Sequence, residues 1–358
     1  MHGDGEQAGP AGEPVGVGLI GYGVAGSVFH APLVQAEPGL RLVAVASGRP
    51  ERVRRDHPQV RVVGTPAELL DDPAVELVVV AAPNTLHFEL TGLALRAGRH
   101  VVVDKPFVNQ VAEADELIRL ATTTGRLLSV FHNRRWDADY RTVRRCIQAG
   151  LLGRVSTYIA RYDRFRPQFR GGWREQDRPG SGVLFDLGAH LVDQALQLFG
   201  LPETVLADVR GQRPDAATDD YAHLVLGYGA LRAILHAGSL VRLPGPRFEV
   251  HGDKGSFVKH GLDPQEEALR LGRRPGEPGW GVEAEARHGT LATDAGGLLV
   301  TGTLASEPGA YETFYRQMAR AVRGEAGVPV RPEEARDTIR VLEAALAASR
   351  DGRVVTLR

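Results

Sequence analysis

The chain has 358 residues, a formal net charge of −1, 43% hydrophobic residues and 24% charged residues, the composition of an ordinary soluble globular protein with about two domains. A balance of charge this close to neutral argues against the broad basic surface that nucleic-acid binding requires. No apolar run reaches the roughly 18 residues of a membrane span. We therefore expect a cytoplasmic protein with neither nucleic-acid nor membrane partners.

Residues 1–13 are polar and rich in glycine, and they lack the basic start and apolar middle of a signal peptide. We expect a disordered tail there. Cys146 is the only cysteine, which excludes an internal disulfide. The remainder is expected to divide into a dinucleotide-binding domain over 14–132 and a substrate-binding and oligomerisation domain over 133–358.

Strands and helices are predicted to alternate in the first domain. Val15–Ile20 predicts a buried strand ending at Gly21, and a helix is expected over about 25–35. The further predicted strands are 41–46, 60–63, 75–81, 100–103 and 127–131, and the further predicted helices are 66–70, 86–97 and 112–123. This alternation is typical of a doubly wound parallel sheet, the Rossmann type of α/β fold.

The pattern changes after residue 133. The predicted elements are a helix over 138–148, an extended stretch over 155–164, a loop over 166–182, an apolar helix over 184–199, strands over 205–211, 221–226, 231–237, 247–251 and 256–260, and closing helices over 311–323 and 332–350. Residues 272–309 are expected to be irregular. We predict a C-terminal α+β domain with a large, mostly antiparallel open sheet, one face of which is covered by helices.

Residues 21–26 carry the pattern Gly-x-Gly-x-x-Gly between the first predicted strand and the first predicted helix, the context in which this motif binds a dinucleotide. The first glycine permits a tight turn, the second lets the backbone approach a diphosphate, and the third lets helix and strand pack closely. The helix N-terminus then offers free N–H groups to the phosphates. A glycine-rich turn without a ligand is the alternative. The residues expected to contact the cofactor here are Gly21, Gly23, Val24, Ala25 and Gly26.

The end of the second predicted strand indicates which dinucleotide binds. Most NAD enzymes place Asp or Glu there to accept the ribose hydroxyls, but this chain has no acid between Ala46 and Glu51. Arg49 suits a 2′-phosphate, and Ser47 can add a hydrogen bond. The pattern predicts NADP(H) rather than NAD(H), unless Arg49 is an ordinary solvated side chain.

Lys105 is one of only three lysines among the 43 basic residues. It follows Asp104 directly beyond the predicted strand 100–103, and open α/β sheets bind ligands at the carboxyl ends of their strands. Lysine is a compact cation whose pKa burial can lower, whereas arginine keeps its proton. We interpret Lys105 as a functional residue rather than a solvated lysine.

The apolar helix over 184–199 carries Asp186, His190 and Asp193 along one stripe. A histidine there is a natural general base for alcohol oxidation near neutral pH. A core histidine satisfied by a neighbouring aspartate is one alternative, and a metal site built from the three side chains is another. Because no cysteine or second nearby histidine completes a usual ligand set, we predict no metal.

Together these segments resemble the glucose–fructose oxidoreductase and inositol dehydrogenase family (Gfo/Idh/MocA). The resemblance runs from about residue 15 to the C-terminus. The matching segments are 21–26, Ala82-Pro83-Asn84 with His87, Asp104-Lys105-Pro106, 132–137 and 186–190. The chain departs from the family at Asp104, where glutamate is usual, and this change keeps the charge. The sequence is similar in particular to NADP-dependent scyllo-inositol dehydrogenases, which interconvert scyllo-inositol and its ketone.

The resemblance implies catalytic roles for Lys105 and His190, with Asp186 assisting. It also implies a homodimer or homotetramer formed through the open sheet of the second domain. The residues that it implies near the cofactor are Pro83, Asn84, His87, Asp104, Lys105 and Asn133. Some relatives have lost activity and serve as sugar-responsive regulators, so a catalytically inactive NADP-binding sugar sensor is an alternative function.

The stretch before the predicted catalytic helix carries aromatic and basic side chains. Tyr162, Arg164, Arg166, Trp173 and Arg174 are expected to line the mouth of a site whose substrate also meets Lys105, Asp186 and His190. Arginine and tryptophan suit polyol rings, although arginine also suits carboxylates and phosphates. The expected reaction is NADP(H)-dependent interconversion of a ring secondary alcohol and its ketone, with an inositol or a related cyclitol or sugar as substrate. A phosphorylated or acidic sugar is the alternative, and the arginines are otherwise ordinary loop residues.

Overall fold

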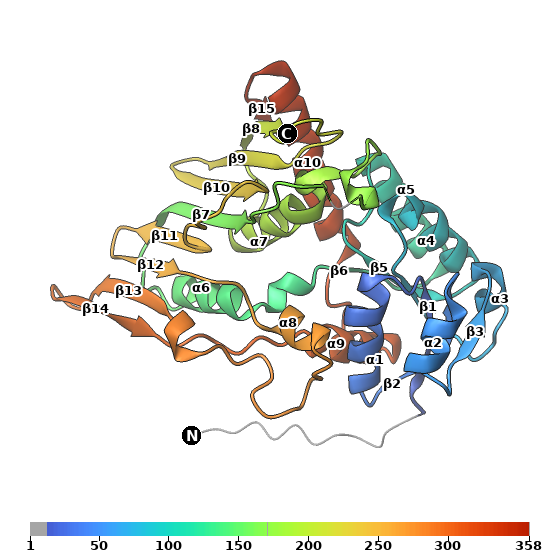
Figure 1. The fold of residues 1–358 in the computed structure, drawn as a ribbon. Helices are drawn as coiled ribbons and strands as arrows, with labels where there is room; N and C mark the ends of the chain where they lie inside the picture. The colour runs from blue at the N-terminus through green and yellow to red at the C-terminus, as the bar shows by residue number, and fades with distance from the viewer. Residues whose placement is uncertain (1–12, 170, 358) are drawn as a thin grey trace.

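The computed structural model describes residues 13–169 and 171–357, which form two sheets with helices packed against them (Figure 1). All of the predicted tail except Glu13 lies outside the described residues. Within the described ranges, no helix is both long enough and apolar enough to cross a membrane.

The first sheet has six strands in the order β3-β2-β1-β4-β5-β6, and every neighbouring pair is parallel. Its strands are β1 (Val15–Ile20), β2 (Leu40–Ala46), β3 (Arg61–Val63), β4 (Leu77–Val80), β5 (His100–Asp104) and β6 (Leu128–Phe131). Every residue of β1 and β4 is buried, as expected for central strands with helices over both faces. The predicted Rossmann fold is confirmed, and its strands end together at one edge.

The helices of this half follow the predicted alternation, with one addition, α2 (Pro50–Asp56), which lies between two strands that were predicted without a helix between them. The others are η1 (Ala25–His30), α1 (Ala31–Ala36), α3 (Pro66–Leu70), η2 (Asn84–Leu86), α4 (His87–Arg96) and α5 (Val111–Thr124). The helix expected over 25–35 begins with a wider π turn, in which the Ala31 N–H donates to the Gly26 carbonyl. Pro32 occupies the first turn of α1 and has no N–H to offer the preceding turn, which weakens the ordinary α pattern there.

The second sheet has nine strands in the order β14-β13-β12-β11-β7-β10-β9-β8-β15. They are β7 (Val155–Asp163), β8 (Thr204–Arg210), β9 (Tyr221–Tyr228), β10 (Leu231–Gly238), β11 (Phe248–Gly252), β12 (Gly255–Lys259), β13 (Gly289–Asp294), β14 (Leu299–Leu304) and β15 (Val355–Thr356). Of the described pairs only β7 and β10 are parallel. The predicted mostly antiparallel sheet is confirmed.

Helices cover one face of this second sheet. The helical segments are η3 (Asn133–Trp136), α6 (Ala138–Gln148), η4 (Trp173–Glu175), η5 (Leu184–Gly188), α7 (Ala189–Phe199), α8 (Gln265–Arg270), η6 (Glu285–Arg287), α9 (Glu312–Val322) and α10 (Pro332–Asp351). Figure 1 shows α6, α7 and α10 beside the sheet. Along β7, Tyr158 and Ala160 are buried beneath helices, while Ile159 and Arg161 alternate to the opposite, partly exposed face.

The expectation that 272–309 is irregular was wrong, because β13 and β14 form an antiparallel hairpin within it. Leu299 and Val300 are 80% and 51% exposed. A strand that buries neither face has no alternation of apolar and polar residues, so its periodicity could not reveal it.

The end of the chain returns to the first sheet. Helix α9 lies beside α1, and α10 lies beside α5. The Ser129 hydroxyl of β6 donates to the Val330 carbonyl at 2.8 Å, and the Val111 N–H donates to Glu343 Oε1 at 2.9 Å. These hydrogen bonds join the C-terminal stretch of the chain to β6 and to the start of α5.

Candidate active site

A cavity of about 1070 Å³ lies at the carboxyl edge of the first sheet and is closed from the other side by residues of the second half. It gathers side chains that lie far apart in the sequence. The predicted site residues that line it are Gly21, Gly23, Val24, Ala25, Ser47, Arg49, Pro83, Asn84, His87, Asp104, Lys105, Asn133, Arg164, Arg166, Arg174, Asp186 and His190.

Two predicted site residues, Gly26 and Tyr162, do not belong to that lining. Gly26 lies beneath the turn, and a Cβ there would stand 2.2 Å from the Gly21 carbonyl oxygen. Tyr162 is 1% exposed, in the sheet, with the Arg247 guanidinium 4.0 Å from its ring centre. Because side chains alternate along β7, Tyr162 falls on the face that the helices cover, not in the mouth. The backbone of Trp173 lies in η4, and its side chain lies outside the described part of the structure.

The glycine turn has the shape that a dinucleotide needs. Gly21 adopts a φ of +96°, a conformation that other residues rarely adopt, and a Cβ there would meet the Ala81 carbonyl at 2.6 Å. At Gly23 a Cβ would meet nothing within 4 Å, because this glycine faces the open cavity. The turn packs tightly against the backbone at Ala81 and is open toward the cavity, so phosphates can approach its backbone from the cavity.

The end of β2 presents a cation to the same cavity. The Arg49 N–H donates to Ser47 Oγ at 3.0 Å, which shapes the turn into α2. Within the described residues the exposed Arg49 guanidinium makes no ion pair or hydrogen bond, and the neighbouring lining residues Gly48, Gly64 and Pro66 bring no acid. This end of the cavity can accept an additional negative charge.

Asn84 and His87 tie the loops beyond β4 and β5 together. Asn84 Nδ2 donates to Asn109 Oδ1 at 3.0 Å and to the Gly180 carbonyl at 2.8 Å. Its Oδ1 is buried in the cavity wall without a hydrogen-bond donor from the described residues. His87 lies between the carbonyls of Pro106 and Ala82, and burial lowers its pKa. The unsatisfied Asn84 oxygen fits a ligand that brings a donor of its own.

Asp104 is held at the floor of the cavity. Its Oδ1 accepts the Lys105 N–H at 2.8 Å and lies 3.8 Å from His30 Nε2, and His30 Nδ1 contacts the Tyr315 hydroxyl at 2.6 Å. Burial by itself would raise the pKa of Asp104, but His30 and the Lys105 ammonium outweigh it and hold the pKa below its usual value. The carboxylate is therefore ionised near neutral pH.

Lys105 and Asp186 meet across the two halves of the chain. Lys105 Nζ donates to the Asp186 carbonyl at 2.6 Å and to its Oδ1 at 3.0 Å. Burial lowers the pKa of Lys105 despite the opposing charge of Asp186. Asp186 also meets Arg174 Nε at 3.1 Å and Arg164 Nη1 at 3.7 Å. Burial would raise the pKa of Asp186, but these three cations hold it well below its usual range, so Asp186 is an anion that fixes Lys105.

His190 lies beside this pair. It is 5% exposed, lines the cavity, and has no hydrogen-bond partner for its Nδ1 within the described residues. Burial lowers the pKa of His190 well below 6.5, and the positive charges of Lys105 and Arg134 lower it further. The imidazole is neutral at physiological pH and can accept a proton.

Asp193 does not share the cavity with Asp186 and His190. It accepts from Arg135 Nη2 at 2.6 Å and from Nε at 2.9 Å, and Arg135 Nη1 in turn pairs with Glu334. No group of three His, Cys, Asp or Glu side chains suited to a metal ion occurs among the described residues. Asp186 and His190 line the cavity, whereas Asp193, three residues beyond His190 in α7, is buried in an ion pair with Arg135.

Several residues of the cavity carried no interpretable sequence signal. Phe29, Glu266 and Arg270 line it, yet the pair Glu266 and Arg270 has the ordinary spacing of an exposed helical ion pair. The rarity of lysine also proved an incomplete guide. Lys259 is fully buried in an ion pair with Glu283 at 3.0 Å, where it has a structural role.

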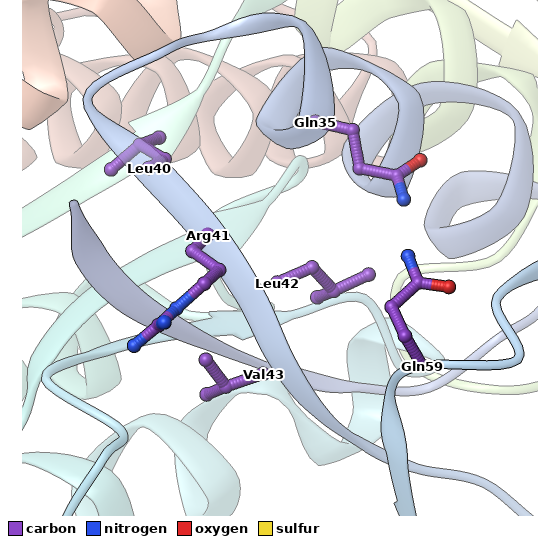
Figure 2. Close-up of a pocket in the computed structure, with 6 residues that line it drawn as sticks. All are labelled: Gln35, Leu40, Arg41, Leu42, Val43 and Gln59. Atoms are coloured by element: carbon purple, nitrogen blue, oxygen red, sulfur yellow. The ribbon is translucent and has the colours of Figure 1, made fainter.

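A smaller hollow of about 440 Å³ lies at the amino end of β2 (Figure 2). Its lining consists of Gln35, Leu40, Arg41, Leu42, Val43 and Gln59. Because the strands of this sheet are parallel, their amino ends lie at the edge opposite the large cavity. Among the described residues, Arg41 is the one ionisable side chain in this lining, so they provide no pair of groups for acid–base chemistry here.

Buried His132, behind the cavity, predicts a pH-dependent stability. Burial lowers the pKa of His132 from 6.5 to about 4, so between these values the unfolded chain binds a proton that the folded chain does not. Protonation of His132 in the unfolded chain therefore lowers the free energy of unfolding as pH falls through this window, by about 1.4 kcal/mol per pH unit. We expect His132→Gln to remove this dependence.

The measurement is urea unfolding of the wild type and the variant between about pH 4.5 and 7.5. The pKa values of Asp137 and Asp219, raised by burial to about 7 and about 6, give slopes of opposite sign, but they cancel in the difference between the two proteins. A difference that does not change with pH would contradict the prediction.

The fold and the cavity define a dinucleotide-binding oxidoreductase with a second α/β domain. Residues 15–132 match the family model described as "Oxidoreductase family, NAD-binding Rossmann fold", and residues 144–357 match "Oxidoreductase family, C-terminal alpha/beta domain". The chain belongs to the Gfo/Idh/MocA family of oxidoreductases.

Two curated relatives and one solved structure are similar over nearly the whole chain. The scyllo-inositol 2-dehydrogenase (NADP(+)) IolW of Bacillus subtilis is 44% identical, with 96% of each chain covered. The uncharacterised oxidoreductase YdgJ of Escherichia coli is also 44% identical, covering 93% of this chain and 96% of its own. The solved structure of the Bacillus subtilis oxidoreductase yvaA has a TM-score of 0.94 at 43% identity and covers 97% of this chain and 99% of its own.

Proposed function

We propose that this protein is an NADP(H)-dependent oxidoreductase that interconverts a ring secondary alcohol and its ketone, with an inositol such as scyllo-inositol, or a related cyclitol or sugar, as substrate. The observation that carries the proposal is one cavity that joins the glycine turn of residues 21–26 to Lys105, Asp186 and His190. The glycine turn and these acid–base groups line one cavity, which supports hydride transfer between a bound dinucleotide and a substrate.

The side chains have complementary roles in this reaction. In the oxidative direction, neutral His190 takes the hydroxyl proton of the substrate, and the Lys105 ammonium stabilises the negative charge that develops on that oxygen. The bound nicotinamide would supply hydride acceptance at the same carbon. Asp186 orients Lys105 through its carbonyl and carboxylate oxygens. Because the pKa of His190 is low, its protonated form is a strong acid that readily returns the proton to a carbonyl oxygen in reduction.

The preference for NADP(H) follows from Arg49, and replacing this residue tests it. We expect Arg49→Ala to raise the KM for NADPH roughly 10- to 100-fold, the effect of losing a charge-assisted hydrogen bond to a phosphate, while the KM for NADH stays the same. Steady-state kinetics with both cofactors measure the effect. A wild type that prefers NADH, or a variant that loses both cofactors equally, would contradict the role of Arg49.

The substrate class is supported by the neutral polyol named for the relative IolW and by a cavity with hydrogen-bonding side chains. One observation favours a second candidate, a phosphorylated or acidic sugar. Arg164 and Arg174 lie beside Asp186, Arg166 lines the same cavity, and arginine binds carboxylates and phosphates well.

Cofactor reduction with a panel of cyclitols, neutral sugars, sugar phosphates and sugar acids separates these candidates. Turnover restricted to neutral rings supports the first proposal, and turnover restricted to anionic substrates supports the second. Tight NADPH binding without turnover of any member would instead indicate a catalytically inactive sugar sensor.

We also propose that the protein is a homodimer or homotetramer assembled through the helix-free face of the second sheet. That face carries side chains such as Leu206 and Ile159 that point away from the helices, which supports burial against another copy. Light scattering of the wild type and of a Leu206→Glu variant tests the assembly. A monomeric wild type would contradict it.

A further inference from the structure

The short helix α8, labelled in Figure 1, belongs to the second half of the chain but packs against η1, the helix that follows the glycine turn. Glu266 and Arg270 of α8 line the same cavity as Val24 and Ala25 of that turn. A segment some 240 residues away in sequence therefore closes the cavity over the turn that the first half supplies.

An ionised glutamate holds the Arg270 side chain in place. Glu266 Oε2 accepts from Arg134 Nη2 at 2.6 Å, and its Oε1 accepts from Arg270 Nη2 at 2.8 Å and Nε at 3.2 Å. Burial would raise the pKa of Glu266, but Arg134 and Arg270 outweigh it and lower the pKa. Glu266 thus binds the Nε and Nη2 edge of the Arg270 guanidinium. Within the described residues Arg270 Nη1 makes no hydrogen bond.

Arg270 differs in placement from the other cations of the cavity. Arg49 stands at the end of β2, Lys105 is bonded to Asp186, and Arg134 is committed to Asp137 and Glu266. Arg270 is carried by the element packed on η1. The diphosphate of a dinucleotide lies at the start of that helix in a Rossmann domain, and a half-exposed guanidinium there is well suited to its charge.

We propose that Arg270 is a cofactor-binding residue that donates a charge-assisted hydrogen bond to the diphosphate of the dinucleotide, so that the second half of the chain contributes to cofactor affinity. This inference rests on the proposed dinucleotide-dependent function. The competing interpretation is a helical ion pair between Glu266 and Arg270 with no role in binding, which would contribute little to stability or affinity.

The test is direct binding of NADPH and NADH to the intact protein, measured by calorimetry. We expect Arg270→Ala to raise the Kd for both cofactors by the same factor, about 10-fold, because both carry the diphosphate. Arg270→Lys should recover part of the affinity, since it restores the charge. Arg49→Ala should weaken NADPH binding alone, which makes it a matched comparison for a 2′-phosphate contact.

Arg273→Ala is the control for the loss of one positive charge. Arg273 lies three residues further on, is absent from the cavity lining, and bonds to Glu277 and the Pro278 carbonyl. We expect this variant to bind both cofactors as the wild type does, and thermal unfolding of each variant establishes that the fold is kept.

Three results would overturn the inference. The first is unchanged cofactor binding by Arg270→Ala. The second is a loss of affinity for NADPH alone, which would assign Arg270 to the 2′-phosphate. The third is an equal loss of affinity in Arg273→Ala, which would show that the effect depends only on net charge. A wild type that binds neither dinucleotide would overturn the proposed function together with this inference, so the two failures are distinguishable.

Discussion

Replacing His190 by Ala is expected to lower kcat by about 10²- to 10⁴-fold, the usual contribution of a positioned general acid or base. The imidazole is buried, neutral and open to the cavity. Binding of NADPH should persist, because the glycine turn and Arg49 lie at the other end of the cavity. Turnover is measured with the best substrate of the panel, and binding is measured by calorimetry.

The pH profile gives this prediction a second readout. Because burial and neighbouring cations lower the pKa of His190 well below 6.5, its basic form is retained as pH falls through 6.5 and is lost only at more acidic pH. We expect no acid limb near 6.5 in wild-type alcohol oxidation. His260→Ala, at an exposed position outside the cavity lining, is the matched control and should keep normal turnover. A His190→Ala enzyme with near-normal turnover would refute the assigned role.

Replacing Lys105 by Met is expected to lower kcat by about 10²- to 10³-fold, the loss that follows removal of a donor to a developing oxyanion. Methionine has a similar length but carries no charge and donates no hydrogen bond. Its introduction leaves Asp186 beside Arg164 and Arg174, so the carboxylate stays paired and the fold should survive. The measurement is kcat with saturating cofactor, with thermal unfolding run in parallel.

The lysine prediction has its own control and pH signature. Lys254→Met removes the same charge from an exposed turn and should leave kcat unchanged. Because the pKa of Lys105 is lowered from 10.5, the wild-type rate should decline as pH rises toward 10.5, at a lower pH than an ordinary lysine would give. An alkaline limb that is unchanged in Lys105→Met, or a loss of kcat in Lys254→Met, would argue against this assignment.

Much of the fold was predictable because local patterns of apolar and polar residues determine its strands and helices. Runs such as that of β4, in which all four residues are apolar and buried, identify central strands, and their alternation with helices predicts a parallel sheet. The β13–β14 hairpin escaped prediction because β14 is exposed along nearly its whole length and β13 is mostly half-buried, so neither strand shows a regular alternation of apolar and polar residues.

A residue of the candidate site was predictable where the strand or helix that carries it is sufficient to determine its position. Lys105 follows β5 directly, so its place at the carboxyl edge follows from the strand alone. The face taken by Tyr162 depends on which side of β7 the helices cover, and the partner of Asp193 is Arg135, 58 positions away in the chain. Such pairings are not encoded in spacing along a single element.

The sequence by itself determined the nucleotide-binding half of this protein, because strand, glycine turn and helix are adjacent and their geometry is fixed by local backbone preferences. Only the tertiary structure decided which cations surround Asp186 and that Arg270 lines the same cavity as the glycine turn. The physical reason is that these contacts form when two sheets, built from distant stretches of chain, pack against each other. The charge balance of the cavity is a property of that packing.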